Sequence, residues 1–427
     1  MEMTRKAKHS SAVVGGLAAL VAVLGIAIWS MKRHRAPALS LDCDAPLEEL
    51  IPSLSGLTLG MPIAGNAVEI FENGAFFDAL LADIAAAKRT VHFETFLWKE
   101  GKLGQRMADA FCERARAGVD VRLTLDAAGC RKMGEAARRQ LRAAGCRVAL
   151  FHPRTPSHLG VVVERDHRKI AVIDGRVAWI GGHCIVDEWL GDARNAHEVR
   201  DLSVRLRGPI VHAVQSAFSE NWVGVTGELF AGDGAFMPLE NAGDVVAHLA
   251  SVKPEGSAPA VKILHHMAIL CAKKTIRIQN PYFIPEPEAI TALAAAVERG
   301  VDVRIMVPST EASDMRPVQH AAHRTFQRLL DSGVRVFEYQ KTLLHQKVIT
   351  VDGIWSAVGS SNFDDRSFET NDEITLGFLD KALARRLEMI FEKDCAECIE
   401  LQATTWRQRG LWHRAKDNAS YLLNEVL

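Results

Sequence analysis

The sequence has almost no net charge. Its 427 residues include 51 Lys and Arg residues against 52 Asp and Glu residues, a formal net charge of -1 at pH 7. A protein that binds nucleic acid is usually basic, because it neutralises the phosphates it contacts. We therefore expect no nucleic-acid partner.

The sequence also lacks the motifs of nucleotide-dependent and metal-dependent enzymes. No glycine-rich loop opens a helix after a strand, and no His-Glu-x-x-His run or carboxylate cluster is present. The eight cysteines are scattered except for Cys395 and Cys398, a single Cys-x-x-Cys pair in charged helical sequence. Scattered thiols are typical of a reducing compartment. We therefore predict no metal, no redox centre and no cofactor.

Charge is also missing from residues 12 to 30, a run rich in Ala, Val, Leu and Gly. At about 1.5 Å per residue, a helix of this length spans a ~30 Å hydrocarbon layer. A cleaved signal peptide is the alternative, with residues 36 to 38 as the cleavage site. The basic residues 32 to 35 would then lie before that site, which disfavours cleavage. We predict one N-terminal transmembrane helix, and basic residues on both sides leave its orientation open.

One later stretch contains the groups that bind and attack a phosphate. His345 and Lys347 are two residues apart, so on a strand their side chains share one face. A β-branched apolar run follows, and Asp352 with the next glycine is typical of a hairpin turn. The returning strand ends in small residues, including Ser360, and then Asn362. This unit presents an imidazole, an ammonium group and an amide, which suit an anionic phosphate.

A second copy of this motif lies 178 residues earlier. His167, Lys169 and Asp174 repeat the spacing, again with glycines downstream. The surroundings repeat as well, since residues 118 to 122 and 300 to 304 both read Gly-Val-Asp-Val-Arg. Two ordinary buried hairpins would not share both His and Lys at matched positions by chance. We infer two homologous halves, each with one His/Lys hairpin.

The pattern of each half predicts an α/β fold. Near-continuous apolar strands alternate with helical stretches, which predicts a mixed β-sheet flanked by helices. In the first half the expected strands are 90 to 97, 119 to 125 and 147 to 151, and the expected helices are 75 to 87, 103 to 116 and 131 to 144. The expected regions are an anchor (1–40), a first half (41–230), a Gly- and Pro-rich linker (231–260) and a second half (261–427). The last of these ends in an amphipathic helix, either docked on the core or lying on lipid.

The duplicated motif resembles the phospholipase D superfamily. Residues 280 to 285 (Asn-Pro-Tyr-Phe-Ile-Pro) and 361 to 368 resemble its bacterial cardiolipin synthase branch, and the likeness covers residues 58 to 415. The resemblance implies two phospholipase D-like halves with a cleft at a pseudo-twofold interface. It implies phosphatidyl transfer between membrane phospholipids at the bacterial inner (cytoplasmic) membrane. The expected substrates are two phosphatidylglycerols, and the expected products are cardiolipin and glycerol.

The resemblance also implies roles for the motif residues. One imidazole attacks phosphorus to form a phosphohistidine, and the other protonates the departing alkoxide. By analogy His167 is the nucleophile and His345 the acid, while Lys169 and Lys347 neutralise the non-bridging oxygens. The predicted catalytic residues are His167, Lys169, Asp174, His345, Lys347 and Asp352.

Five further residues are predicted to orient the histidines or contact the phosphate. Asp201 and Glu373 match the acidic residues that orient the imidazoles in the family, and Ser360 follows the second hairpin. The position 17 residues after each motif histidine holds Asn362 in the second half but Cys184 in the first, where the family has Asn. A thiol is a weak donor, so we expect one phosphate contact to be missing or changed.

The sequence leaves other functions open. With water as acceptor the same chemistry gives a phospholipase D hydrolase, and with another substrate a phosphodiesterase nuclease. A membrane-bound binding protein with a decayed site is a further alternative, suggested by Cys184. The anchor and the neutral charge favour lipid over nucleic acid. The lipid acceptor and the oligomeric state are not determined.

Two histidines outside the motifs share a helix face. His320 and His323 are three residues apart, and we interpret them as part of a solvated face. A lipid headgroup contact at the mouth of the cleft is the alternative. His265 and His266 have no ligand spacing to a carboxylate or thiol, and we predict a structural role for them.

Overall fold

The computed structural model describes residues 45–153, 164–232, 235–253 and 259–421, together with residues 25, 39 and 41. The chain divides into two compact units, Met1–Ser40 and Leu41–Leu427. Of the predicted anchor at residues 12 to 30, the structure describes residue 25 alone, so the anchor prediction lies outside the described residues in all but that position. Within the ranges that are described, no helix is both long and apolar enough to cross a bilayer. The description below concerns the second unit.

The first half alternates strands and helices in the predicted order. The predicted helix at residues 131 to 144 is divided, because Gly134 at φ 82° separates a 3₁₀ turn from an α-helix. The strands are β1 (Ile63–Glu72), β2 (Thr90–Thr95), β3 (Asp120–Asp126), β4 (Arg147–Phe151), β5 (Lys169–Ile173), β6 (Val177–Gly181), β7 (Val199–Arg200) and β8 (Leu202–Arg207). The helices are α3 (Ala75–Ala86), α4 (Lys102–Arg116), η2 (Gly129–Met133), α5 (Glu135–Ala143), η4 (Asp187–Trp189) and α6 (Val211–Thr226). The preceding helix, α2 (Leu47–Leu57), packs in the core of the second half.

The second half repeats this order. Its strands are β9 (Val245–Val252), β10 (Thr275–Gln279), β11 (Asp302–Pro308), β12 (Arg335–Tyr339), β13 (Leu343–Leu344), β14 (Val348–Val351), β15 (Trp355–Gly359), β16 (Glu373–Leu379) and β17 (Cys398–Glu400). Its helices are α7 (Ala260–Cys271), α8 (Pro287–Glu298), α9 (Arg316–Asp331), α10 (Asp365–Glu369), α11 (Lys381–Cys395), α12 (Ala403–Arg407) and α13 (Leu411–Tyr421).

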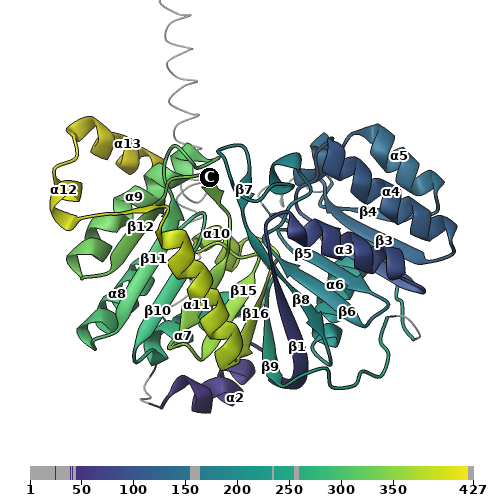
Figure 1. Cartoon of the computed structure of the whole chain (residues 1–427), viewed down its shortest axis with the longest axis horizontal. Helices are drawn as coiled ribbons and strands as arrows, with labels where there is room; N and C mark the ends of the chain where they lie inside the picture. The colour runs from purple at the N-terminus through teal and green to yellow at the C-terminus, as the bar shows by residue number, and fades with distance from the viewer. Residues whose placement is uncertain are drawn as a thin grey trace, which may run out of the picture. The chain divides into compact units, whose positions relative to one another are not determined.

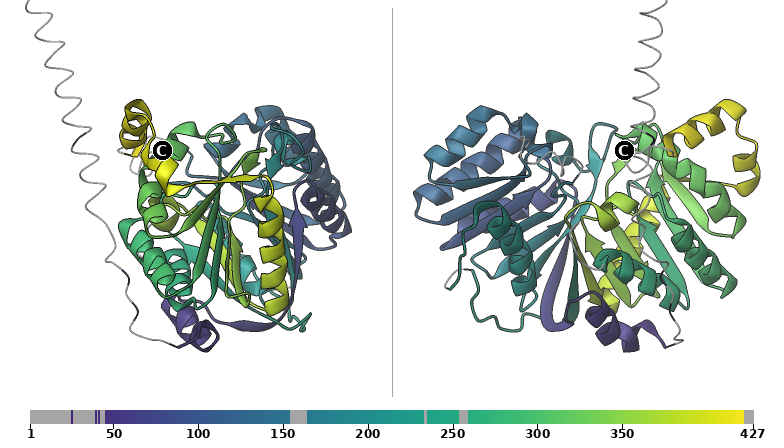
Figure 2. Two further views of the ribbon diagram at one scale, coloured as in Figure 1. Left: turned by 60° about the vertical axis from the view of Figure 1, so that its left-hand side comes forward. Right: turned by 180° about the vertical axis from the view of Figure 1, so that it is seen from behind.

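One 15-stranded sheet runs through both halves, in the order β17-β12-β11-β10-β14-β15-β16-β9-β1-β8-β6-β5-β2-β3-β4 (Figure 1). Apart from β17, this order is symmetric about the contact between β9 and β1, so each strand has a counterpart in the other half. Helices lie on both faces of the sheet (Figure 2). The predicted α/β fold of two like halves is confirmed.

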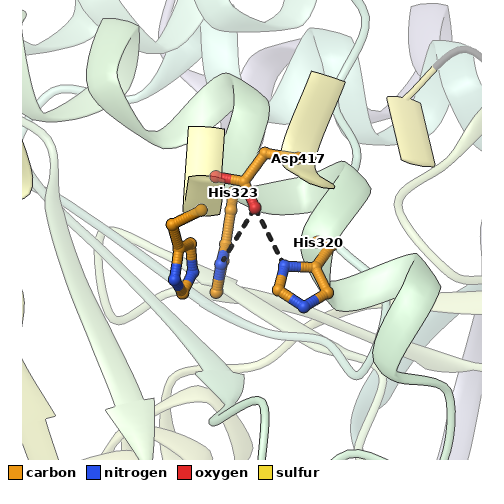
Figure 3. Close-up of side chains that lie close together, drawn as sticks. His320, His323 and Asp417 are labelled. Carbon is orange, nitrogen blue, oxygen red and sulfur yellow. Dashed lines mark hydrogen bonds and ion pairs between the residues drawn. The ribbon is translucent and has the colours of Figure 1, made fainter. Parts of the chain in front are cut away.

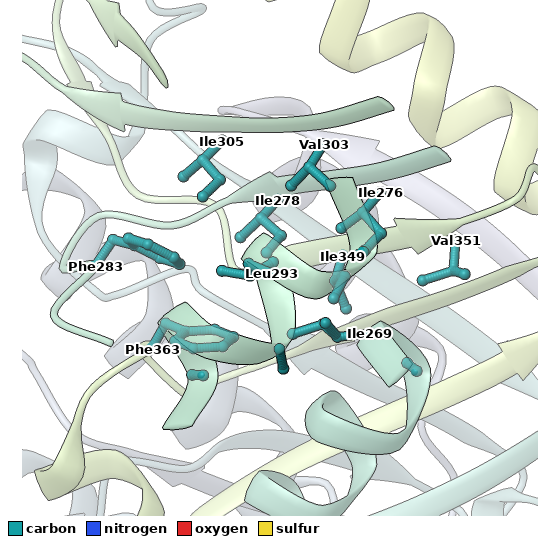
Figure 4. Packing of buried hydrophobic residues seen from close by; sticks show 14 of the residues in the cluster. Ile269, Ile276, Ile278, Phe283, Leu293, Val303, Ile305, Ile349, Val351 and Phe363 are labelled. Atoms are coloured by element: carbon teal, nitrogen blue, oxygen red, sulfur yellow. The ribbon is translucent and has the colours of Figure 1, made fainter. Parts of the chain in front are cut away.

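The apolar strands form the cores because helices cover them. In the second half Ile276 and Ile278 of β10 and Val303 and Ile305 of β11 pack towards Leu293 of α8 (Figure 4). Residues two apart on a strand share a face, which brings these side chains into one layer. Full burial of each such side chain is worth roughly 1.5–3 kcal/mol. The same core includes Ile349 and Val351 of β14, the strand that follows His345 and Lys347, so this packing fixes the position of the motif.

The structure differs from the sequence prediction at the linker. Within residues 231 to 260, Val245–Val252 forms β9, which pairs along its length with β16 and more briefly with β1. In the sheet order β9 is the counterpart of β1, so the second half begins before residue 245 and not at residue 261. The glycines and prolines that indicated a linker only flank this strand, and its burial depends on partners distant in sequence.

Candidate active site

The two motif hairpins occupy equivalent places in the sheet. β5 pairs with β2 and β6, and β14 pairs with β10 and β15. Each motif histidine lies just before its strand, and each motif aspartate lies in the turn at the other end. Asp174 and Asp352 have φ values of 52° and 56°, and the glycine after each is also left-handed, as a type I′ turn requires. The predicted Asp-Gly hairpins are confirmed.

The motif aspartates do not belong to the cluster around the histidines. The Asp174 carboxylate accepts backbone N–H groups at the start of β2, and the Asp352 carboxylate accepts those at the start of β10. The donors lie at 2.6 to 3.2 Å and are Lys88, Arg89 and Thr90 for the first, and Lys273, Lys274 and Thr275 for the second. Their predicted catalytic role is therefore corrected to a structural one, because each ties a hairpin turn to the neighbouring strand.

A carboxylate from the opposite half holds each motif histidine. His167 Nδ1 lies 2.9 Å from Glu373 Oε1, and His345 Nδ1 lies 2.8 Å from Asp201 Oδ2. Both carboxylates have no exposed surface. A neutral imidazole that donates from Nδ1 to a carboxylate keeps its lone pair on Nε2. The two rings are therefore prepared to accept a proton or attack through Nε2.

Backbone pairing between the halves brings each histidine to the carboxylate of the other half, and we call this exchange the crossed arrangement. β13 pairs in parallel with β7, and the next residue, His345, donates its N–H to Arg200 O at 2.7 Å. At the symmetry-related place His167 N donates to Asp372 O at 3.0 Å, and Asp372 N donates to Arg165 O at 2.8 Å. Each histidine thus lies beside the residue that precedes its orienting acid.

Further residues fix the two carboxylates. The Trp189 indole donates to Asp201 Oδ2 at 2.9 Å, and its ring lies nearly perpendicular to the His345 ring, with the ring centres 5.3 Å apart. The Ser360 hydroxyl donates to Glu373. Ser360 was predicted to orient or contact the phosphate, and the structure gives it the orienting contact. The sequence analysis missed Trp189, because nothing in its spacing relates it to the motif.

Lys169 and Lys347 bring positive charge to both histidines. Lys169 Nζ donates to His167 O at 2.6 Å, and Lys347 Nζ donates to His345 O at 3.0 Å. Lys347 Nζ also lies 3.1 Å from His345 Nε2. Among the described residues, no equivalent partner contacts the Nε2 atom of His167. The two halves therefore differ, and His167 has the less engaged lone pair.

Burial keeps both imidazoles neutral. It lowers the pKa of His167 to about 4 against the opposing effect of Glu373, and the positive charges of Lys169 and Lys347 lower it further. Burial followed by Lys347 lowers the pKa of His345 as well, and Lys169 of the other half adds to this. Burial also lowers the pKa of Lys347 to about 8, although Asp201 opposes this shift. An anionic phosphate beside these groups would raise all three pKa values again, so substrate binding favours formation of an imidazolium acid.

Comparison with known proteins shows the family. The family model described as cardiolipin synthase, PLD-like domain, matches residues 80–221 and 267–395, which is one segment in each half. The chain belongs to this family. It is 34% identical over 356 residues to a cardiolipin synthase of Geobacillus kaustophilus, covering 82% of this chain and 70% of the relative. It is 33% identical over 357 residues to cardiolipin synthase 2 of Bacillus cereus, covering 82% and 68%.

A solved structure agrees in fold. Phosphatidylserine synthase from Haemophilus influenzae superimposes with a TM-score of 0.67 at 15% identity, covering 87% of this chain and 98% of that one. At that identity the likeness concerns the arrangement of the chain. It supports the two-half architecture of this cardiolipin synthase-like protein.

Cys184 occupies the position at which the resemblance predicted asparagine. Its side chain is 2% exposed and its thiol contacts Gly182 O at 3.6 Å. Burial raises the pKa of the thiol, while Lys169 lowers it, so the neutral thiol lies near the site's cations. At the symmetry-related position Asn362 has a buried Oδ1 that has no hydrogen-bond partner among the described residues. The amide oxygen only accepts, so a phosphate contact at Asn362 would come from its Nδ2–H group.

We expect Cys184→Asn to leave the transfer rate unchanged or raise it several-fold, and Asn362→Cys to lower it. A hydrogen bond is worth about 0.5–1.5 kcal/mol, and more to a charged acceptor, so the loss at Asn362 should reach about ten-fold. Transfer rates and melting temperatures of both variants are the measurements. If Cys184 is only a packed thiol, Cys184→Asn buries an unpaired amide. A fall in both rate and melting temperature for that variant would contradict the expectation.

Proposed function

We propose that this protein is a phosphatidyltransferase that joins two phosphatidylglycerols into cardiolipin and releases glycerol. The observation that carries the proposal is the crossed pair of buried imidazole–carboxylate contacts beside two lysines. This arrangement supplies a nucleophile, a proton donor and positive charge for a phosphodiester at one place. Curated relatives that bear the name cardiolipin synthase support the choice of substrate class.

In the first step of the proposed reaction, His167 Nε2 attacks the phosphorus of one phosphatidylglycerol. A phosphorus–nitrogen bond forms and the bond from phosphorus to the glycerol headgroup breaks. Protonated His345 gives its proton to the departing oxygen, and glycerol leaves. Lys169 and Lys347 offset the negative charge of the non-bridging oxygens.

In the second step a headgroup hydroxyl of another phosphatidylglycerol attacks the phosphohistidine. Neutral His345 now takes the proton of that hydroxyl, the phosphorus–nitrogen bond breaks, and His167 is released neutral. Glu373 and Asp201 hold the two rings throughout. Water in place of the second lipid would give phosphatidic acid, which is the hydrolase alternative.

We further propose that the protein acts at the bacterial inner membrane, held there by an N-terminal helix at residues 12 to 30. That run is uncharged and long enough to span the hydrocarbon layer. The balanced net charge of -1 supports a lipid substrate over nucleic acid.

Incubation of the purified full chain with phosphatidylglycerol labelled in its headgroup glycerol tests this function. We expect cardiolipin and one free labelled glycerol for each cardiolipin formed. Phosphatidic acid with free glycerol would instead identify a hydrolase. Cleavage of DNA without any lipid product would identify a nuclease, and either result would overturn the proposal.

We expect transfer to continue in excess EDTA. Lys169 and Lys347 stabilise the negative charge of the phosphate in the proposed reaction, so no step needs a metal ion. Initial rates with and without chelator, measured well below the melting temperature, provide the check. Loss of activity that a divalent ion restores, without any change in folding, would point to a different mechanism.

A further inference from the structure

Four side chains of the kind that bind metals meet outside the active site. His320 and His323 lie on α9, and His413 and Asp417 lie on α13. One ligand atom from each lies within 4.8 Å of every other (His320, His323 and Asp417 are shown in Figure 3). The interpretation of a solvated face is wrong for His323, whose side chain is 3% exposed.

The cluster arises where two helices pack. α13 packs along α9, so the described part of the predicted terminal helix docks on the core. Spacings of i,i+3 on α9 and i,i+4 on α13 place each pair of ligands on one helix face. Metal sites between packed helices are built in this way, from inward-facing pairs.

The hydrogen bonds around His323 prepare its Nδ1 atom as a ligand. Its Nε2 lies 3.2 Å from Glu338 Oε1, which fixes the ring proton on Nε2. Its Nδ1 is buried and has no hydrogen-bond partner among the described residues. That atom faces Asp417 Oδ1 at 3.9 Å. A lone pair and a carboxylate oxygen thus face each other without a proton between them, an arrangement that a bound cation would satisfy.

The carboxylate of Asp417 is also oriented for this purpose. Its Oδ2 accepts a hydrogen bond from Arg409 Nη1 at 2.6 Å, and the Arg409 guanidinium lies 3.7 Å from the centre of the Trp406 ring. Oδ1 is thereby directed to the histidines and lies 2.9 Å from His320 Nδ1. Asp417 is itself 1% exposed. Both buried ligands therefore have an outer partner, as in protein metal sites.

We propose that His320, His323, His413 and Asp417 bind one Zn²⁺ ion. Three imidazoles and one carboxylate are a ligand set that zinc accepts in tetrahedral geometry. Four protein ligands leave no open position, so the site is structural. It joins α13 to α9 and thereby holds the C-terminal helix on the second half. It takes no part in phosphatidyl transfer.

The test uses the full chain without a histidine tag, stripped with a chelator that is then removed. Titration with Co²⁺ is expected to give one equivalent bound, with the visible absorption of tetrahedral cobalt, and Zn²⁺ should displace it. His320→Ala and His413→Ala, at partly exposed positions that tolerate truncation, should each weaken binding at least ~100-fold, and Glu338→Ala ~10–100-fold. His197→Ala, at an exposed histidine outside the cluster, should bind as the parent does.

Trypsin provides a second measurement that does not depend on activity. Arg407 and Arg414 flank the start of α13 and are exposed. At free Zn²⁺ near 100 times Kd, opening of α13 and hence cleavage there should fall ~100-fold. His413→Ala should lose this protection. If the cluster is instead held together by a protonated imidazole, the parent chain will give no tetrahedral cobalt spectrum. That result overturns the proposal. Binding that persists in a His320→Ala/His413→Ala double variant overturns it as well.

Discussion

His167→Ala and His345→Ala are each expected to reduce phosphatidyl transfer by at least the ~10²–10⁴-fold that a general acid–base group supplies. Both rings are buried and each is held by a carboxylate of the other half. Removal of either ring leaves the site without its nucleophile or without its proton donor. Transfer rates on phosphatidylglycerol vesicles are the measurement, and melting temperatures establish that the variants remain folded.

The two variants should differ in what accumulates. On a phosphatidyl substrate whose leaving group needs no proton, His345→Ala should form the adduct on His167 and then stall. His167→Ala should form none. The contact of Lys347 with His345 Nε2 supports this assignment, because it engages the lone pair that a nucleophile needs. An adduct trapped on His345 would reverse the two roles, while the absence of any adduct would contradict the phosphohistidine.

Glu373→Gln and Asp201→Asn are expected to act on the histidine of the opposite half. In Glu373→Gln the amide oxygen can accept the hydrogen bond from the Ser360 hydroxyl. The NH₂ group of the glutamine then points towards His167 Nδ1. The ring proton then moves to Nε2 and blocks the attack. A wrong tautomer of this kind costs as much as ~10⁴-fold in a serine protease triad. We expect a loss of at least ~10²-fold on the same basis.

The crossing also predicts which step each variant blocks. Glu373→Gln should prevent formation of the adduct on His167, although Glu373 lies in the second half. Asp201→Asn should still permit the adduct on a substrate with a good leaving group and block its resolution, because it disturbs His345. Ser360→Ala is the matched control. It removes a hydrogen bond to the Glu373 carboxylate without changing the tautomer. Such a bond to a charged group is worth about 1.5–3 kcal/mol, so we expect a loss of ~10–100-fold in rate while the adduct on His167 still forms. If each variant affected the step of the histidine in its own half, the crossed arrangement would be wrong.

Local chemistry explains why so much of the site could be predicted. The spacing of His345 and Lys347, and its repetition at His167 and Lys169, was recognisable as the two-residue period of a strand, although β14 begins at Val348 and β5 at Lys169. That period is a property of the backbone and needs no partner. The Asp-Gly turns were predictable for the same reason, since left-handed backbone favours those residues. The resemblance to a family added Asp201 and Glu373, which spacing alone would not have found.

The errors arose where function depended on partners distant in sequence. Asp174 and Asp352 recur in the motif, but repetition does not reveal which way a carboxylate points, and both bind backbone amides of a neighbouring strand. The strand β9 was hidden in a segment with linker composition, because only its pairing with β16 and β1 buries it.

The sequence by itself determined the duplication, the α/β class, the paired histidines and lysines, and the family. Each of these follows from local periodicity or from a repeated spacing in the sequence. Only the tertiary structure decided that each histidine is held by an acid of the other half. That contact joins residues more than 140 positions apart through a short parallel pairing. It also brought His320 and His323 of α9 to His413 and Asp417 of α13, because helix packing follows buried faces and leaves no spacing signal between segments about 90 residues apart.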